Sequence, residues 1–139
     1  MKLLWSKTAL FIFVIFALSA CKDPGSKEVT LTSGLRYEVL KEGSGKAAQI
    51  GDEVIIKEKL EYMDGTLLYS TENRGVNLPK FTLGQKHVID GVDQGVQGMR
   101  VGEVRKLVVP PELSKRETYP KFLSADSTLV YTIELITIM

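Results

Sequence analysis

The sequence has few of the residues from which covalent, redox and metal sites are built. Among its 139 residues there is one cysteine and one histidine. No disulfide can therefore form within the chain, and no set of His and Cys side chains has the spacing of a metal site. A Ser/His/Asp arrangement for covalent catalysis is also missing. We expect a domain that is stabilised by its hydrophobic core and that needs no metal or other cofactor.

The sequence also lacks an excess of either charge sign. Lysine and arginine number 18 and aspartate and glutamate 17, which gives a net charge of +1 at pH 7. A near-neutral chain has no basic field for nucleic acid, and it would not be attracted electrostatically to anionic lipid. We therefore expect no nucleic-acid partner.

The longest apolar run is too short for a membrane-spanning helix, which needs about 20 apolar residues. It extends from Thr8 to Ala17, follows Lys2 and Lys7, and is succeeded by the small-residue stretch Leu18-Ser19-Ala20. A basic start, a short apolar core and small residues before a cleavage point are the layout of a secretory signal. The sequence predicts that residues 1–20 are a signal peptide.

The stretch Leu18-Ser19-Ala20-Cys21 resembles the lipobox of bacterial lipoproteins. That resemblance implies cleavage before Cys21 and acylation of its thiol, whereas the alternative is an ordinary core cysteine. Residues 21–33 are mostly polar and include a Pro-Gly pair, so we expect a lipidated flexible tether. The expected location is the bacterial cell envelope. Since Lys22 is not the Asp that often signals inner-membrane retention, the outer membrane is favoured, and surface exposure stays open.

Residues 34–139 have the pattern of one α+β domain. Short runs of alternating apolar residues predict strands at 35–40, 53–62, 67–70, 79–83, 103–109 and 127–138, with an Asp-Gly hairpin turn after the second. Apolar residues at helical spacing predict one helix over 88–99. Gly91, Gly95 and Gly98 within it indicate that a sheet packs closely against this helix. We expect an antiparallel sheet that covers a single helix.

Four motifs in this domain, in order and in register, resemble FKBP-type peptidyl-prolyl cis-trans isomerases. They are Gly51-Asp52 leading to Asp64-Gly65, the segment 81–85, the segment 88–103, and the segment 127–131 with Glu134-Leu135. The resemblance covers 35–138. It implies an antiparallel half-barrel wrapped around the helix, with an apolar pocket between them that binds a proline ring. The partners would be proline-containing polypeptides, and the activity would be isomerisation of X–Pro bonds in exported proteins, by a monomer.

The resemblance also implies roles for individual residues. Val88 and Ile89 match the aliphatic pair at the helix entrance, where the Ile89 backbone N–H would hold a substrate carbonyl, and Tyr131 keeps an aromatic wall. The remaining expected pocket positions depart from the family pattern, in which most are aromatic: Glu58, Leu68, Tyr69, Val92 and Lys115, with Tyr119 as a substitute source of a hydroxyl group.

These departures leave two alternatives open. Activity would be low because the lining has lost aromatic area, or the fold would serve as a non-catalytic protein-binding module at the membrane surface. A structural alternative for Glu58 and Lys115 is a surface ion pair worth at most about 1 kcal/mol. His87 is expected to be exposed and structural.

Overall fold

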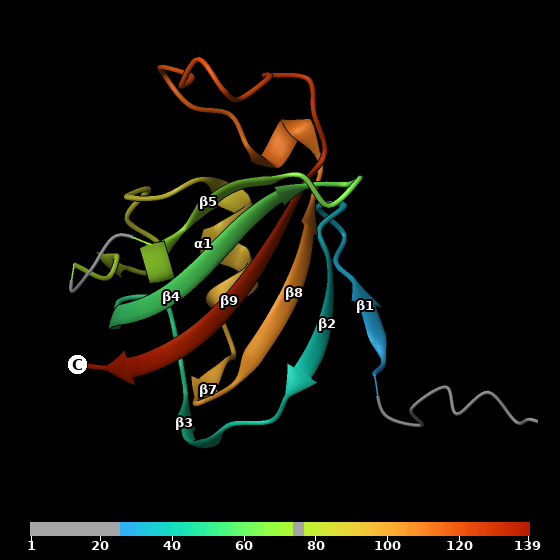
Figure 1. Ribbon diagram of the computed structural model, residues 1–139. Helices are drawn as coiled ribbons and strands as arrows, with labels where there is room; N and C mark the ends of the chain where they lie inside the picture. The colour runs from blue at the N-terminus through green and yellow to red at the C-terminus, as the bar shows by residue number, and fades with distance from the viewer. Residues whose placement is uncertain (1–25, 74–76) are drawn as a thin grey trace, which may run out of the picture.

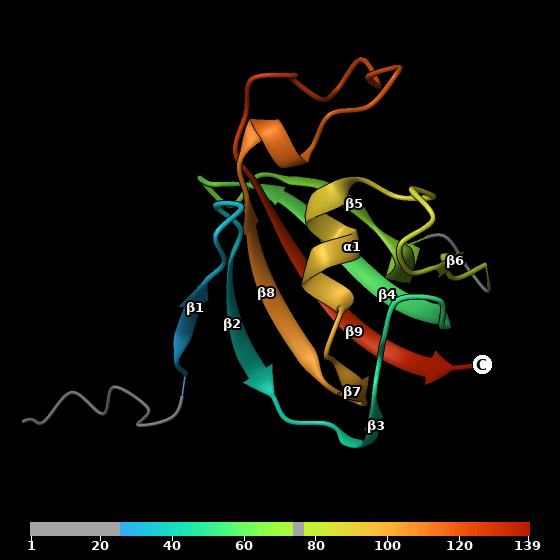
Figure 2. The same cartoon turned by 180° about the vertical axis from the view of Figure 1, so that it is seen from behind.

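A curved antiparallel sheet packs around one short helix in the computed structural model, which describes residues 26–73 and 77–139. The strands follow the order β1-β2-β8-β9-β4-β5, and β6 pairs with the N-terminal end of β4. Figure 2 shows α1 in the hollow of this sheet, against β8 and β9. The predicted α+β half-barrel is confirmed. The main-sheet strands are β1 (Glu28–Thr30), β2 (Arg36–Lys41), β4 (Glu53–Tyr62), β5 (Leu67–Ser70), β6 (Lys80–Thr82), β8 (Val104–Val109) and β9 (Leu129–Ile138).

The central strands β4 and β9 follow the predicted alternation. On β9, Leu129, Ile133 and Leu135 are fully buried and Tyr131 is nearly so. The same face of β4 buries its apolar residues and carries Glu58 among them, half-buried. Period-2 burial on one face is what an antiparallel sheet produces when it covers a core on that side. The hairpin of β4 and β5 forms around the predicted Asp-Gly turn.

The helix is shorter than predicted. We expected residues 88–99, whereas α1 comprises Asp90–Val96. Ile89 has extended backbone angles and precedes the first turn, and Gly98 ends the helical path with φ +81°. Val88 and Met99 continued the apolar spacing because they pack on the same core from the flanking segments, so the pattern alone overestimated the helix.

The glycines of α1 confirm the expected close packing against the sheet. A Cβ atom at Gly91 would lie 2.4 Å from Cγ1 of Val109, and one at Gly95 would lie 2.3 Å from Cδ1 of Leu107. Both distances are far inside van der Waals contact. The helix reaches β8 this closely only because these two positions have no side chain.

The folded part begins earlier than predicted. Residues 28–30, assigned to the flexible tether, form β1 and pair with β2 through Val29 and Tyr37. The prediction missed this strand because three residues are too few to show an alternation. It also missed β3 (Ser44–Ala47) and β7 (Arg100–Val101), which pair with each other across a register shift. The predicted signal peptide and Cys21 lie outside the described residues, so they stay predictions. None of the helices in the two described ranges is long and apolar enough to cross a bilayer.

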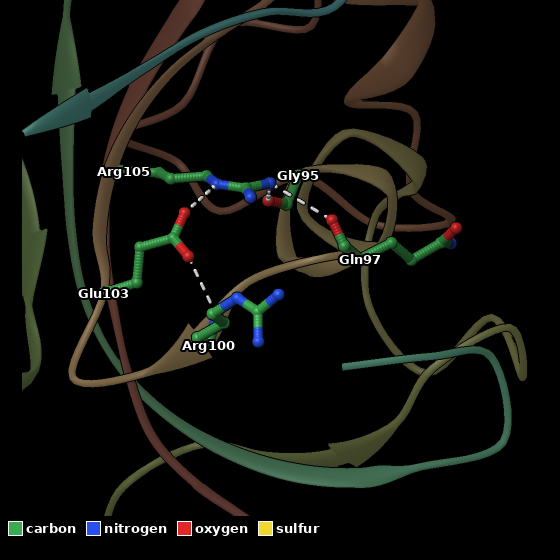
Figure 3. A network of polar contacts seen from close by, with 5 residues as sticks. All are labelled: Gly95, Gln97, Arg100, Glu103 and Arg105. Atoms are coloured by element: carbon green, nitrogen blue, oxygen red, sulfur yellow. Dashed lines mark hydrogen bonds and ion pairs between the residues drawn. The ribbon is translucent and has the colours of Figure 1, made fainter. Parts of the chain in front are cut away.

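A buried charged network holds the C-terminal end of α1 (Figure 3). The Arg105 guanidinium donates hydrogen bonds to the carbonyl oxygens of Gly95 at 3.2 Å and Gln97 at 3.1 Å, and it pairs with the Glu103 carboxylate. The second Glu103 oxygen accepts the Arg100 backbone N–H at 2.9 Å. The last carbonyl groups of a helix have no partner within the helix, and a cation there also complements the helix dipole. The network fixes α1 to β8.

Candidate functional site

An open hollow of about 800 Å³ lies at the N-terminal end of α1. Its walls come from the loop before the helix, from the concave face of β4 and β9, and from the loop that follows β8. The lining residues are Glu58, Lys86, His87, Val88, Ile89, Asp90, Val92, Lys115, Arg116, Glu117, Thr118 and Tyr131. Six of the nine side chains predicted to form the pocket are in this set.

The apolar part of the hollow combines residues from three elements. Val92 of α1 is 2% exposed and Tyr131 of β9 is 5% exposed, while Val88 and Ile89 are half-buried. Tyr131 lies opposite Leu60 of β4, one step along the same face from Glu58. Side chains two residues apart on a strand point to the same side. The sheet register therefore brings Glu58 and Tyr131 to one wall, and the helix brings Val92 against it.

Ile89 offers a backbone donor at this wall. Its carbonyl oxygen accepts the N–H groups of Val92 at 3.1 Å and Asp93 at 3.0 Å, which closes the first turn of α1. Its own N–H has no hydrogen-bond acceptor among the residues that the structure describes. A free N–H group beside an apolar wall can bind a carbonyl oxygen of a ligand.

Arg116, Glu58 and the Tyr131 hydroxyl give part of this wall a polar character. The Arg116 guanidinium donates a hydrogen bond from Nη2 to the Tyr131 hydroxyl oxygen at 3.2 Å. Burial raises the pKa of the Glu58 carboxyl above its ordinary value, and the Arg116 charge acts against this shift. Burial also raises the pKa of Tyr131, against the smaller lowering effects of the hydrogen bond and charge of Arg116. A half-buried acid, a fixed cation and a phenol thus meet in the hollow.

The cation that acts on Glu58 is Arg116 and not Lys115. The sequence left open a surface ion pair between Glu58 and Lys115, but Lys115 is exposed at the rim, and the ion pairs of the described residues do not include this one. Arg116, the next residue, turns inward. The short 3-10 helix Pro111–Leu113 sets the direction in which the loop leaves β8, and no sequence pattern shows which of two adjacent cations then faces the core.

Three predicted pocket residues lie beside the hollow rather than in its lining. Leu68 and Tyr69 of β5 and Tyr119 of the late loop are half-buried and pack on the core. The ring of Tyr119 lies under the Arg116 guanidinium, 6.0 Å from Cζ to the ring centroid, and Tyr119 is not among the residues that line the hollow. His87 is exposed as expected, but it lines the hollow, and its Nδ1 accepts the Thr82 backbone N–H at 3.3 Å.

The late loop above the hollow is attached to β4. The Tyr62 hydroxyl donates to the Phe122 carbonyl oxygen at 3.0 Å and accepts the Ser124 backbone N–H at 3.2 Å. These bonds fix a long segment that projects beyond the end of the sheet in Figure 1. Within residues 26–73 and 77–139, no three His, Cys, Asp or Glu side chains are grouped so that they could hold a metal ion.

Known proteins share this architecture and sequence. The family model described as FKBP-type peptidyl-prolyl cis-trans isomerase matches residues 44–136. FK506-binding protein 2 of Yarrowia lipolytica is 37% identical over 92% of this chain and 87% of its own length. The chloroplastic peptidyl-prolyl cis-trans isomerase FKBP16-4 of Arabidopsis thaliana is 36% identical over 88% of this chain and 56% of its own. The solved structure of FkpA from Escherichia coli superposes with a TM-score of 0.70 at 32% identity, over 85% of this chain and 53% of that one.

Proposed function

The chain belongs to the FKBP-type peptidyl-prolyl cis-trans isomerase family, and we propose that the hollow at the N-terminal end of α1 is where it isomerises X–Pro bonds. The observation that supports this site is the meeting of Val88, Ile89, Val92 and Tyr131 on one apolar wall with the Ile89 N–H beside them. The substrates are polypeptides that contain proline.

The geometry suits a reaction that needs no covalent step. An X–Pro amide must lose its planarity and partial double-bond character to rotate, against a barrier of about 18–20 kcal/mol. The apolar wall would take the proline ring out of water. The Ile89 N–H would hold a substrate carbonyl, so that the remaining motion is rotation about the C–N bond.

We expect activity below that of relatives with an aromatic lining. Where the family pattern has Trp, Val92 leaves the proline ring with less apolar contact, at about 25 cal/mol for each Å² no longer buried. Glu58 places a carboxyl group at the same wall, which is costly to desolvate. The polar part of this wall, formed by Glu58, Arg116 and the Tyr131 hydroxyl, is the observation that favours the second candidate, a module that binds a partner chain without turnover.

We also propose that the domain acts outside the cytoplasm as a lipid-anchored monomer. The arguments are the signal-like residues 1–20 and the lipobox-like stretch that ends at Cys21. Uncatalysed X–Pro isomerisation takes tens to hundreds of seconds, so even a slow enzyme would accelerate the folding of exported proteins.

Refolding of a protein whose slow phase is proline isomerisation tests the catalytic proposal. The purified chain should accelerate that phase in proportion to its concentration. Ile89→Pro is the sharp variant: Ile89 has φ −61°, which proline adopts, so the substitution removes the N–H while the backbone angle is kept. Ile89→Ala is the matched control for the lost side chain. We expect the proline variant to be several-fold slower than the alanine variant; equal rates would show that the N–H plays no part.

A further inference from the structure

Three contacts restrain the Arg116 side chain at the wall of the hollow. Its Nη2 donates to the Tyr131 hydroxyl at 3.2 Å, its Nε donates to the Ser114 carbonyl oxygen at 3.4 Å, and the Tyr119 ring lies beneath its guanidinium. Because these contacts restrain this long side chain, a ligand that binds it loses less conformational entropy than it would with an unrestrained arginine.

Part of the guanidinium remains available to a ligand. It carries five N–H donors, and in the described part of the chain its hydrogen bonds use only Nε and Nη2. The charge of Arg116 acts on the Glu58 carboxyl, but these two side chains do not form one of the ion pairs of the described residues. The two N–H groups of Nη1 and the second N–H of Nη2 therefore have no acceptor among the described residues, and Arg116 is one of the residues that line the hollow. One N–H from each of these two nitrogens forms a fork that matches the two oxygens of a carboxylate.

The other charges around the hollow leave Arg116 dominant. At the rim, the cations Lys86 and Lys115 are exposed and oppose the exposed anions Asp90 and Glu117, and water and salt screen all four. Among the described residues that line the hollow, Glu58 is the one anion that is not exposed, and it opposes Arg116. Burial disfavours the ionised form of a carboxyl group, whereas a guanidinium keeps its charge.

We propose that Arg116 is a specificity-determining residue that selects substrates with acidic residues next to the proline. The inference rests on the proposed function, because it assigns a substrate class to the same hollow. A carboxylate beside the proline would accept hydrogen bonds from Nη1 and Nη2 of Arg116 while the ring contacts Val92 and Tyr131.

Three matched peptides test this selection: Glu-Pro-Glu, Gln-Pro-Gln and Lys-Pro-Lys within one neutral sequence. Their isomerisation by the full chain is measured by exchange spectroscopy, which needs no coupling protease. We expect kcat/KM for the Glu peptide to exceed that for the Lys peptide about fivefold, equivalent to about 1 kcal/mol. Arg116→Gln should bring this ratio close to one, and Arg116→Lys should leave an intermediate ratio because it keeps the charge and loses the fork.

Lys115→Gln is the matched control, since it removes one positive charge from the adjacent rim position. It should preserve most of the preference. Equal turnover of the Glu and Lys peptides by the natural chain would overturn the inference. An unchanged Glu-to-Lys ratio of kcat/KM in Arg116→Gln would also overturn it. An equal loss of this preference in Arg116→Gln and Lys115→Gln would do the same, because it would show a general electrostatic field instead of a specific contact. If Gln-Pro-Gln is not isomerised, that result counts against the proposed function but not against the role of Arg116. The affinities for the Glu and Lys peptides, measured by chemical-shift titration, would then decide whether Arg116 selects acidic residues.

Discussion

Glu103→Ala should destabilise this domain far more than loss of any exposed carboxylate. The Glu103 and Arg105 side chains are only 4% and 8% exposed, so both charges have been taken out of water. Without Glu103, the guanidinium keeps its bonds to the carbonyl groups of Gly95 and Gln97, but its charge has no counter-ion. The backbone N–H of Arg100 also loses its acceptor.

The size of the effect follows from that burial. Breaking a buried ion pair by removing one partner costs about 3–5 kcal/mol, a large share of the roughly 5–15 kcal/mol that stabilises a domain. At about 4 °C for each kcal/mol in a domain of this size, Tm should fall by about 12–20 °C. The Glu53–Lys80 pair is the control, because its side chains are 41% and 48% exposed. Glu53→Ala should cost about 1 kcal/mol or less.

Urea denaturation of the variants, followed by circular dichroism, measures these free energies of unfolding. Arg105→Met leaves Glu103 buried without a cation and should also be strongly destabilising. The double variant should cost at least about 1 kcal/mol less than the two single variants together, since neighbours in one network are not additive. The reasoning would be refuted by a Glu103→Ala loss no larger than that of Glu53→Ala, or by single effects that add within about 0.5 kcal/mol. If Glu103→Ala isomerises X–Pro bonds more slowly under conditions in which it is still fully folded, the network also helps to position α1 at the hollow.

Three further outcomes are expected. Val92→Trp combined with Glu58→Tyr should raise the isomerisation rate about tenfold. Roughly 60 Å² of regained apolar contact at 25 cal/mol per Å² equals about 1.5 kcal/mol. An unchanged rate in the folded variant would contradict the assignment of this wall to the proline ring. Glu58→Gln should stabilise the fold at pH 7, because burial raises the pKa of Glu58 and the ionised form is disfavoured in the folded state. That gain should vanish below the ordinary pKa of 4.5, where the carboxyl is protonated in both states, and a gain that grows in acid would exclude this explanation. Finally, Cys21→Ser should leave an uncleaved chain without lipid label in cells fed labelled palmitate; a cleaved, labelled product would disprove the predicted anchor.

Local patterning determined most of the framework from the sequence alone. The period-2 runs identified β4, β8 and β9 because one face of each strand is covered by a core and the other is not. The glycines at 91 and 95 predicted a close approach of helix and sheet, because a glycine in a helix interior is unfavourable unless space demands it. The four motifs in register were enough to predict the family by resemblance.

Tertiary structure decided the features that depend on contacts between distant segments. The helix ends at Val96 although the apolar spacing continues, because Met99 reaches the core from outside the helix. Arg116 instead of Lys115 faces Glu58, since the path of a loop sets which of two neighbouring side chains points inward. In the Glu103–Arg105 network, the Arg105 side chain binds the carbonyl groups of Gln97 and Gly95, which lie eight and ten residues before it in the chain. A residue pattern records local preference, and such pairings exist only when the folded backbone brings the partners together.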